Sequence, residues 1–165
     1  TIGLLYNAGE TNSVTLVNQE KAAAEAMGLK VVEASAASSA EVLAAAQSLV
    51  GRCEAISVLT DNTVVSAIES VVKVCQENKI ALVAGDIGTV EAGAVAAYAF
   101  DYHDHGVQAG NIAAQILQGT PIAKIPVQYA QNLQLAINLA AAAAMVLQRP
   151  PAKSATGIST PNCGL

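Results

Sequence analysis

Four clusters of polar residues each follow a short apolar run, and their side chains are suited to holding a small solute by hydrogen bonds. The clusters comprise residues 7–13, 34–39, 60–63 and 85–86. In a parallel sheet whose strands alternate with helices, ligands bind beyond the carboxyl ends of the strands, beside the N-termini of the following helices. Free N–H groups there suit a carboxylate, and the carboxylates of Asp61 and Asp86 suit an ammonium group. The pattern indicates binding of a small zwitterion or another polar molecule.

The same residue types also have a purely structural interpretation, because Ser, Thr, Asn and Asp are the residues that cap helices. On that interpretation, Asn12 or Ser13 caps the first helix and residues 60–63 cap the third. The clusters taken together point to a ligand more strongly than any single member does.

Other kinds of site lack their motifs. Neither GxGxxG nor a Walker lysine follows the first strand, so no nucleotide cofactor is expected. His103 and His105 would point about 200° apart on a helix, and the three cysteines form no CxxC pair, so no metal site is expected. No GxSxG elbow marks a serine nucleophile. We therefore expect no catalytic residues and no cofactor.

Composition excludes further classes of protein. The formal net charge is −5 and only 3% of residues are aromatic, so the chain lacks the basic surface and stacking rings of a nucleic-acid binder. A hydrophobic fraction of 53% excludes disorder over most of the length. The longest apolar run, residues 133–147, is shorter than the ~20 residues that a membrane span needs. Because Thr1 begins the chain and no signal peptide is visible, we expect a piece cut or processed from something longer, whose location this sequence leaves unknown.

The first half has the pattern of a parallel α/β sheet. Apolar strands are expected at residues 2–6, 30–34, 55–59 and 80–84, and helices between them at residues 13–27, 41–50 and 63–78. The strands show no two-residue alternation, as expected when helices cover both faces of the sheet. The sequence predicts an α/β fold, a Rossmann-like three-layer sandwich with a mainly parallel sheet.

The second half is less regular. We expect a strand over residues 93–100, a helix to Gln118, extended pieces at 125–128 and 133–137, and a helix capped by Asn138 that ends near Leu147; beyond it the Pro/Ser/Thr/Gly-rich residues lack periodicity. The predicted organisation is therefore an α/β ligand-binding lobe (1–92), a crossover strand and helix with a closing strand and helix (93–147), and a flexible tail (148–165).

Several segments resemble ABC-transporter substrate-binding proteins of the tryptophan/tyrosine type. The segment Ile2–Ser13 is similar to that family's GVLYNPGEANS, and residues 34–50 and 55–70 match its middle. Phe100-Asp-Tyr, a following Gly-x-x-x-Gly helix and Leu135–Leu139 also match in order and spacing. Departures are Ala8, where the family has Pro, residues 85–88, where it has Ser-Asp-Thr-Asp, and the residues after Leu147.

The resemblance implies one lobe of a type I periplasmic binding protein, namely the second lobe with the segment that crosses back. Such a protein binds a small, amino-acid-like solute between two lobes without catalysis and delivers it to an ABC permease. Its location would be periplasmic, or extracytoplasmic and membrane-anchored. By position, the resemblance places the following residues on the cleft side: Asn7, Glu10, Asn12, Ser13, Thr60, Asp61, Asn62 and Asp86.

Two alternatives stay open beside a solute-binding lobe. One is a folded fragment that acts only as a structural or interaction domain, because half a cleft supplies half of the contacts. The other is a small hydrolase or isomerase that uses Asp61 or Asp86. Without the other lobe, the apolar side of the helix near residues 103–118 would lack its partner. We expect it to be covered by a second chain, in a homodimer through residues 94–147, or by folding back onto its own sheet.

Overall fold

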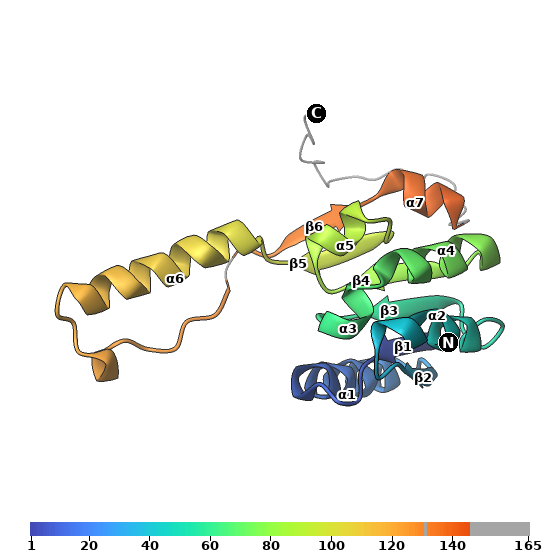
Figure 1. Ribbon diagram of the computed structural model, residues 1–165, viewed down its shortest axis with the longest axis horizontal. Coiled ribbons are helices and arrows are strands. Elements are labelled where there is room, and N and C mark those ends of the chain that lie inside the picture. Colours follow the sequence, from blue (N-terminus) through green and yellow to red (C-terminus); the bar gives the residue numbers. More distant parts are fainter. Residues whose placement is uncertain (131, 146–165) are drawn as a thin grey trace.

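The computed structural model describes residues 1–130 and 132–145, arranged as a sheet-based body from which one helix projects (Figure 1). The strands are β1 (Ile2–Tyr6), β2 (Val31–Ser35), β3 (Ala55–Val58), β4 (Ala81–Ala84), β5 (Ala96–Ala99) and β6 (Gln134–Ile137). The α-helices are α1 (Thr11–Ala26), α2 (Val42–Ser48), α3 (Asn62–Val65), α4 (Ile68–Asn78), α5 (Ile87–Glu91), α6 (Tyr102–Leu117) and α7 (Leu139–Ala144). Short 3-10 turns lie at Ser39–Glu41 and Ile122–Lys124.

The sheet has the strand order β2-β1-β3-β4-β5-β6, with β1 to β5 parallel and β6 antiparallel to β5. Parallel neighbours need a crossover connection between them, and α1, α2, α3–α4 and α5 supply it. The predicted α/β class with a mainly parallel sheet is confirmed. Because all parallel strands point the same way, the loops after β1, β3 and β4 emerge together at one edge.

One face of the sheet carries the main hydrophobic core. Fully buried side chains of the central strands, among them Ile56, Val58 and Leu82, pack there against Val71 and Cys75 of α4. Helices α2, α5 and α7 contribute to the same cluster. Burial raises the pKa of the Cys75 thiol to about 12, which fits the predicted role of this cysteine as a small apolar core residue.

The opposite face is covered by α1 over β1 and β2, and Leu4 of β1 is buried there, as are Val17 and Ala24 of α1. Over β4 to β6, in the part of the chain that the structure describes, this face carries exposed apolar side chains. They are Val83, Tyr98, Leu135 and Ile137. The third layer of the predicted sandwich therefore consists of α1 and lies over β1 and β2.

The prediction of one continuous helix over residues 63–78 is wrong. The helical segment is divided into α3 and α4 at Ser66 and Ala67, and Ala67 has the non-helical angles φ −121° and ψ 23°. Apolar residues at helical spacing run through both parts, so periodicity alone did not reveal the break. The short helix α5 was also missed, because its five residues are fewer than two turns.

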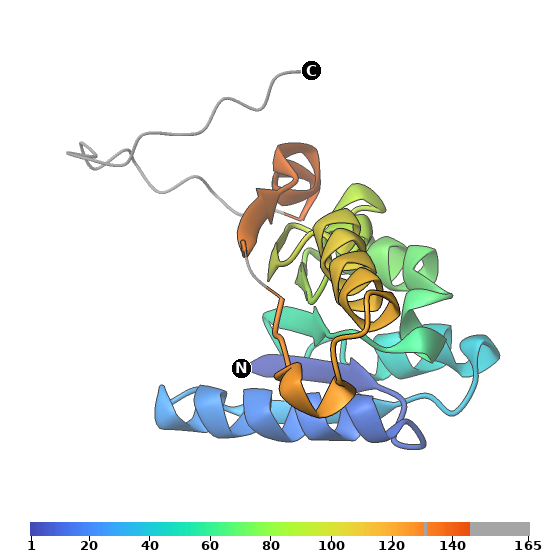
Figure 2. The same ribbon diagram turned by 90° about the vertical axis from the view of Figure 1, so that its left-hand side faces the viewer.

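Helix α6 projects from the body and does not fold back onto its own sheet, so that alternative is wrong (Figure 1). None of its residues is buried. Figure 2 shows α6 nearly end-on, with the chain returning beside it toward β6. The extended piece expected at residues 125–128 joins no strand of the described sheet.

The last described helix, α7, is capped by Asn138, as the sequence predicted. Asn138 accepts a hydrogen bond from the Ala141 N–H at 2.9 Å and so caps α7. Lys79 Nζ donates to the Ala144 carbonyl at 2.9 Å, which holds α7 beside the end of α4. The tail predicted for residues 148–165, and the end of the last helix at Leu147, lie outside the described residues.

Candidate functional site

A hollow of about 440 Å³ lies at the carboxyl edge of the sheet, where three loops meet the start of α6. It is lined by Asn12, Thr60, Asp61, Asn62, Val65, Ser66, Asp86 and Tyr102. Five of the eight predicted site residues therefore share one surface, and Asn7, Glu10 and Ser13 are absent from its lining. This is the position at which a parallel α/β sheet binds ligands.

Asp61 connects two of the loops beneath the hollow. Its side chain is buried and accepts the backbone N–H of Asn7 and of Val64, each at 2.7 Å. The first bond holds the loop after β1, and the second caps α3. Asp61 therefore has the structural role that helix capping predicts, while one side of it faces the hollow.

Glu10 is a second acidic group at the N-terminus of α3. One of its carboxylate oxygens accepts the Asn62 N–H at 3.1 Å and Asn62 Nδ2 at 2.7 Å. The other accepts the Thr63 N–H at 3.0 Å and the Thr63 hydroxyl at 2.7 Å. The hydrogen bond from the Thr63 hydroxyl is the main cause that lowers the pKa of Glu10 to about 2, and the bonds from Asn62 add to it.

Replacing Glu10 with Gln is expected to lower the melting temperature at pH 7, because an amide cannot accept hydrogen bonds at both of its heavy atoms. The folded-state pKa of Glu10 lies below the ordinary value of 4.5, so its stabilisation is complete above about pH 5. It is lost as the pH falls toward 2. The melting temperatures of parent and variant, measured by circular dichroism from pH 7 to pH 2.5, should therefore converge at the acid end. A gap that stays constant with pH would contradict this role.

Asp86 caps α5 in the same manner. Its carboxylate accepts the Thr89 N–H at 2.8 Å and the Thr89 hydroxyl at 2.7 Å. Helices α3 and α5 thus both begin with a carboxylate from this chain. The expectation that their N-termini would hold a solute carboxylate loses its physical basis, since the partial positive charge there is already matched.

Asn7 and Ser13 lie away from the hollow. Asn7 is used within its own loop and beside α3: its Nδ2 donates to the Thr63 hydroxyl at 2.8 Å and its Oδ1 accepts from Gly9 N–H at 2.8 Å. Ser13 is a buried residue of α1, and its hydroxyl has no hydrogen-bond partner among the described residues. Neither Asn12 nor Ser13 caps α1, because the helix starts earlier, with Glu10 at the N-cap position.

Tyr102 is the lining residue that the sequence argument missed. It opens α6, directly beyond the carboxyl end of β5, and its ring lies edge-on to that of Phe100 with the centroids 5.1 Å apart. Its place after β5 at the same sheet edge was an available signal. In the sequence, this tyrosine belongs to the Phe100-Asp-Tyr motif and carries no further sign of a site residue.

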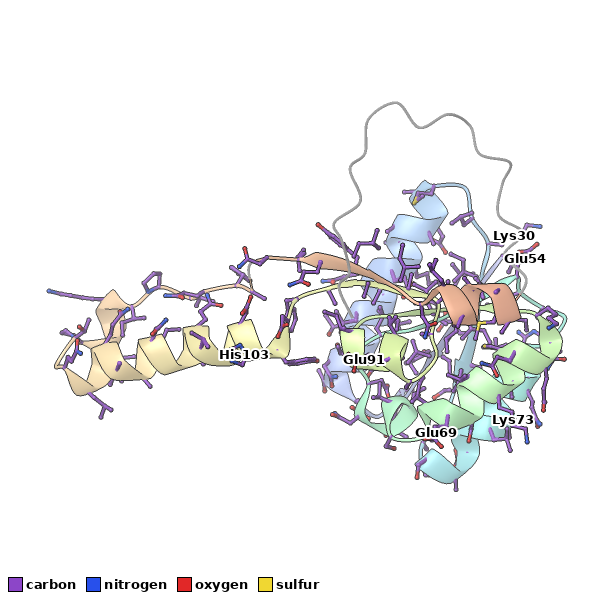
Figure 3. All side chains as sticks on the ribbon, turned by 90° about the horizontal axis from the view of Figure 1, so that it is seen from above. Lys30, Glu54, Glu69, Lys73, Glu91 and His103 are labelled. Atoms are coloured by element: carbon purple, nitrogen blue, oxygen red, sulfur yellow. The ribbon has the colours of Figure 1, made fainter. Side chains whose placement is uncertain are left out.

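The His103 and His105 pair forms no metal site in the described part of the chain, where no group of three potential ligands gathers. His103 lies in the first turn of the projecting helix, at the end nearest the body in Figure 3. Its ring nitrogen is 3.7 Å from Asp104, and both side chains are exposed. His105 packs against Phe100, with the ring centroids 5.1 Å apart.

The family model described as "ABC transporter substrate binding protein" matches residues 1–155. The chain belongs to this family. The resemblance found in the sequence is thereby confirmed, and the family's members are substrate-binding proteins and not enzymes.

Two solved structures and one curated relative are similar to this ABC transporter substrate-binding family member. A conserved domain protein from Vibrio cholerae O1 has a TM-score of 0.83 at 39% identity, covering 87% of this chain and 49% of that one. An ABC domain in complex with L-Trp from Streptococcus pneumonia has a TM-score of 0.81 at 33% identity, with the same coverage. The "Tyrosine-binding protein" of Clostridioides difficile strain R20291 is 38% identical over 137 residues, which are 83% of this chain and 40% of that protein. The chain therefore spans less than half of the length of these proteins.

Proposed function

We propose that this chain forms one wall of a solute site in an extracytoplasmic substrate-binding protein, and that the solute is an aromatic amino acid or a close analogue. The observation that carries the proposal is the hollow at the carboxyl edge of the sheet, in a member of a substrate-binding family. Similar proteins described as tyrosine-binding or as bound to L-Trp support the choice of solute class. Tyr102 supplies an aromatic wall and Val65 an apolar one.

Within this proposal the protein delivers its solute to an ABC permease and performs no catalysis. Both buried carboxylates near the hollow, those of Asp61 and Asp86, accept hydrogen bonds from backbone N–H groups, so neither stands free as a general base.

None of the helices in the described residues combines the length and apolar character needed to cross a membrane.

The test is isothermal titration calorimetry of the chain with the common amino acids. We expect saturable binding of L-tryptophan, L-tyrosine and L-phenylalanine, and weaker binding of alanine and glutamate. Tyr102→Ala should weaken binding of the aromatic solutes by about tenfold, since a ring contact contributes on the order of 1 kcal/mol. Phenylalanine at position 102 is the matched control and should retain most of the affinity. Equal binding of alanine and tryptophan would contradict the proposed solute class.

A second candidate is a folded domain that binds no solute. It is favoured by the number of site residues already used inside the chain: Asp61, Glu10 and Asp86 all cap helices of this chain. Absence of binding for every amino acid at millimolar concentration, in a protein that unfolds cooperatively, would support this candidate over the first.

We further propose that, in the isolated chain, a second copy covers the apolar side of α6. Val107 and Leu117 of this helix are 51% and 88% exposed. A hollow of about 490 Å³ lies between α6 and the returning segment, and Val107, Ile112 and Gln128 are among the residues that line it. Burial of such side chains contributes about 1.5–3 kcal/mol each, and a two-fold contact through residues 94–147 would bury them in both copies at once.

Light scattering after size-exclusion chromatography should therefore give twice the monomer mass at micromolar concentration. Glutamate at both Val107 and Leu117 should convert the protein to a monomer, because each charge would be buried without a partner. The control is Met27→Glu, at an exposed apolar residue at the end of α1, which should stay dimeric. A parent protein of monomer mass at these concentrations would overturn the dimer.

A further inference from the structure

We infer that this wall of the site contacts the ammonium group of the solute and not its carboxylate, so that the chain recognises aromatic primary amines whether or not they carry an acid. The inference rests on the proposed function and adds to it which end of the solute the wall selects. It follows from the orientation of the polar groups around the hollow.

The side-chain amides of Asn12 and Asn62 each use their nitrogen within the chain and leave their oxygen without a donor. Asn12 Nδ2 donates to the Thr60 carbonyl at 2.9 Å, and Asn62 Nδ2 donates to the Glu10 carboxylate at 2.7 Å. Both partners only accept, so the nitrogen must be the atom that faces them, and each amide has a single orientation. No donor among the described residues reaches Asn12 Oδ1 or Asn62 Oδ1, and both residues line the hollow. The amide oxygens of these two lining residues are thus free to accept a hydrogen bond from a solute.

The backbone donors that α3 would offer to a carboxylate are already used. The first four N–H groups of α3 all donate within the chain: those of Asn62 and Thr63 to Glu10, that of Val64 to the Asp61 carboxylate, and that of Val65 to the Asp61 carbonyl. A solute carboxylate would meet no free N–H group at this helix. It would instead lie against oxygen atoms that also only accept. A carboxylate has no hydrogen to donate to them, so no hydrogen bond would form.

Charge favours the same end of the solute. Asp61 and Asp86 line the hollow, Glu10 lies directly behind Asn62, and none of the lining residues is Lys, Arg or His. Each carboxylate oxygen of Asp86 accepts a single bond and keeps a second lone pair. Low-dielectric walls that carry one sign of charge attract the opposite charge. Thr60 and Tyr102 hydroxyls donate or accept equally well and so do not reverse this preference.

The experiment compares three ligands that share one indole ring: L-tryptophan, tryptamine, which lacks the carboxylate, and 3-indolepropionate, which lacks the amine. The protein contains no tryptophan, so indole fluorescence anisotropy reports the ligand alone, with calorimetry as a second readout. We expect tryptamine to bind within about threefold of L-tryptophan and 3-indolepropionate to bind at least about tenfold more weakly.

Two variants test the acceptors themselves. Asn62→Ala and Asn12→Ala should each weaken tryptamine binding by about tenfold and change 3-indolepropionate binding little. Asn12 is exposed on α1, where alanine favours the helix, so this variant stays informative if Asn62→Ala destabilises α3. Asn78→Ala is the matched control: its Nδ2 bonds to the Val74 carbonyl at the C-terminal end of α4, so it should bind like the parent.

The outcomes separate the inference from the function on which it rests. Binding of 3-indolepropionate as tightly as L-tryptophan, or equal binding of all three ligands, would overturn the inference and leave solute binding intact. Binding of none of the three at millimolar concentration would overturn both.

Discussion

Replacing Asp61 with Ala is expected to reduce the free energy of unfolding by about 2–4 kcal/mol. The change leaves two N–H groups without an acceptor, those of Asn7 and Val64, in a place where the lost side chain was 3% exposed. An unsatisfied buried donor costs on the order of 1–3 kcal/mol, and loss of a helix cap costs about 1 kcal/mol. The measurement is urea unfolding followed by circular dichroism, with the slope compared between variants.

Asp101→Ala is the matched control for this prediction. Asp101 also caps a helix, since it accepts the His103 N–H at 2.7 Å, but its bond is exposed to solvent. Water can replace the lost acceptor there, so we expect a loss below about 1 kcal/mol. Asp61→Asn, which retains one acceptor oxygen, should fall between the two. Equal losses for Asp61→Ala and Asp101→Ala would show that the buried connection between the loops contributes nothing beyond capping.

Replacing Gly85 with Ala is expected to cost about 1–3 kcal/mol of stability and to weaken solute binding as well. A Cβ atom at this position would lie 3.0 Å from the Cα of Leu59 and 3.1 Å from the backbone nitrogen of Thr60. The neighbours are backbone atoms and cannot rotate away, so the loop that carries Thr60 must shift. Thr60 lines the hollow, and its carbonyl holds Asn12, so the displacement reaches the site.

The control for Gly85 is Gly106→Ala in α6, where a Cβ atom meets nothing within 4 Å. Alanine favours a helix over glycine by about 1 kcal/mol, so this variant should be as stable as the parent or slightly more stable. Its affinity for L-tryptophan should be unchanged. Unchanged stability and affinity in Gly85→Ala would contradict this prediction. It would mean that the backbone at Gly85 can move away from that of Leu59 and Thr60 without cost.

Element types and their order were predictable from the sequence because they depend on local patterns. Short apolar runs without alternation predicted strands buried on both faces, and glycines after helices predicted their ends. Gly28, with φ +76°, follows α1, and Gly51, with φ +74°, follows α2. The division between α3 and α4 was not predictable in this way, because Ala67 is a good helix former and apolar spacing continues through it.

The composition of the site was predictable in part. All four polar clusters were expected at one edge, and Asn12, Thr60, Asp61, Asn62 and Asp86 do line one hollow, whereas no residue of the cluster 34–39 lines it. Their separate roles were not predictable, because a carboxylate that caps a helix and one that binds a solute have the same sequence signature. Whether the eight predicted residues contact a solute stays a prediction.

The sequence by itself determined the α/β class, the order of the elements and the sheet edge at which polar side chains collect. Each of these depends on contacts between near neighbours along the chain or on the common direction of parallel strands. Only the tertiary structure decided which groups around the hollow are already bonded: Glu10 and Asn62 are 52 residues apart, and Asn7 and Asp61 are 54 apart. A hydrogen bond satisfies a donor only at about 3 Å, so the groups left for a solute depend on distances across the fold that no local pattern contains.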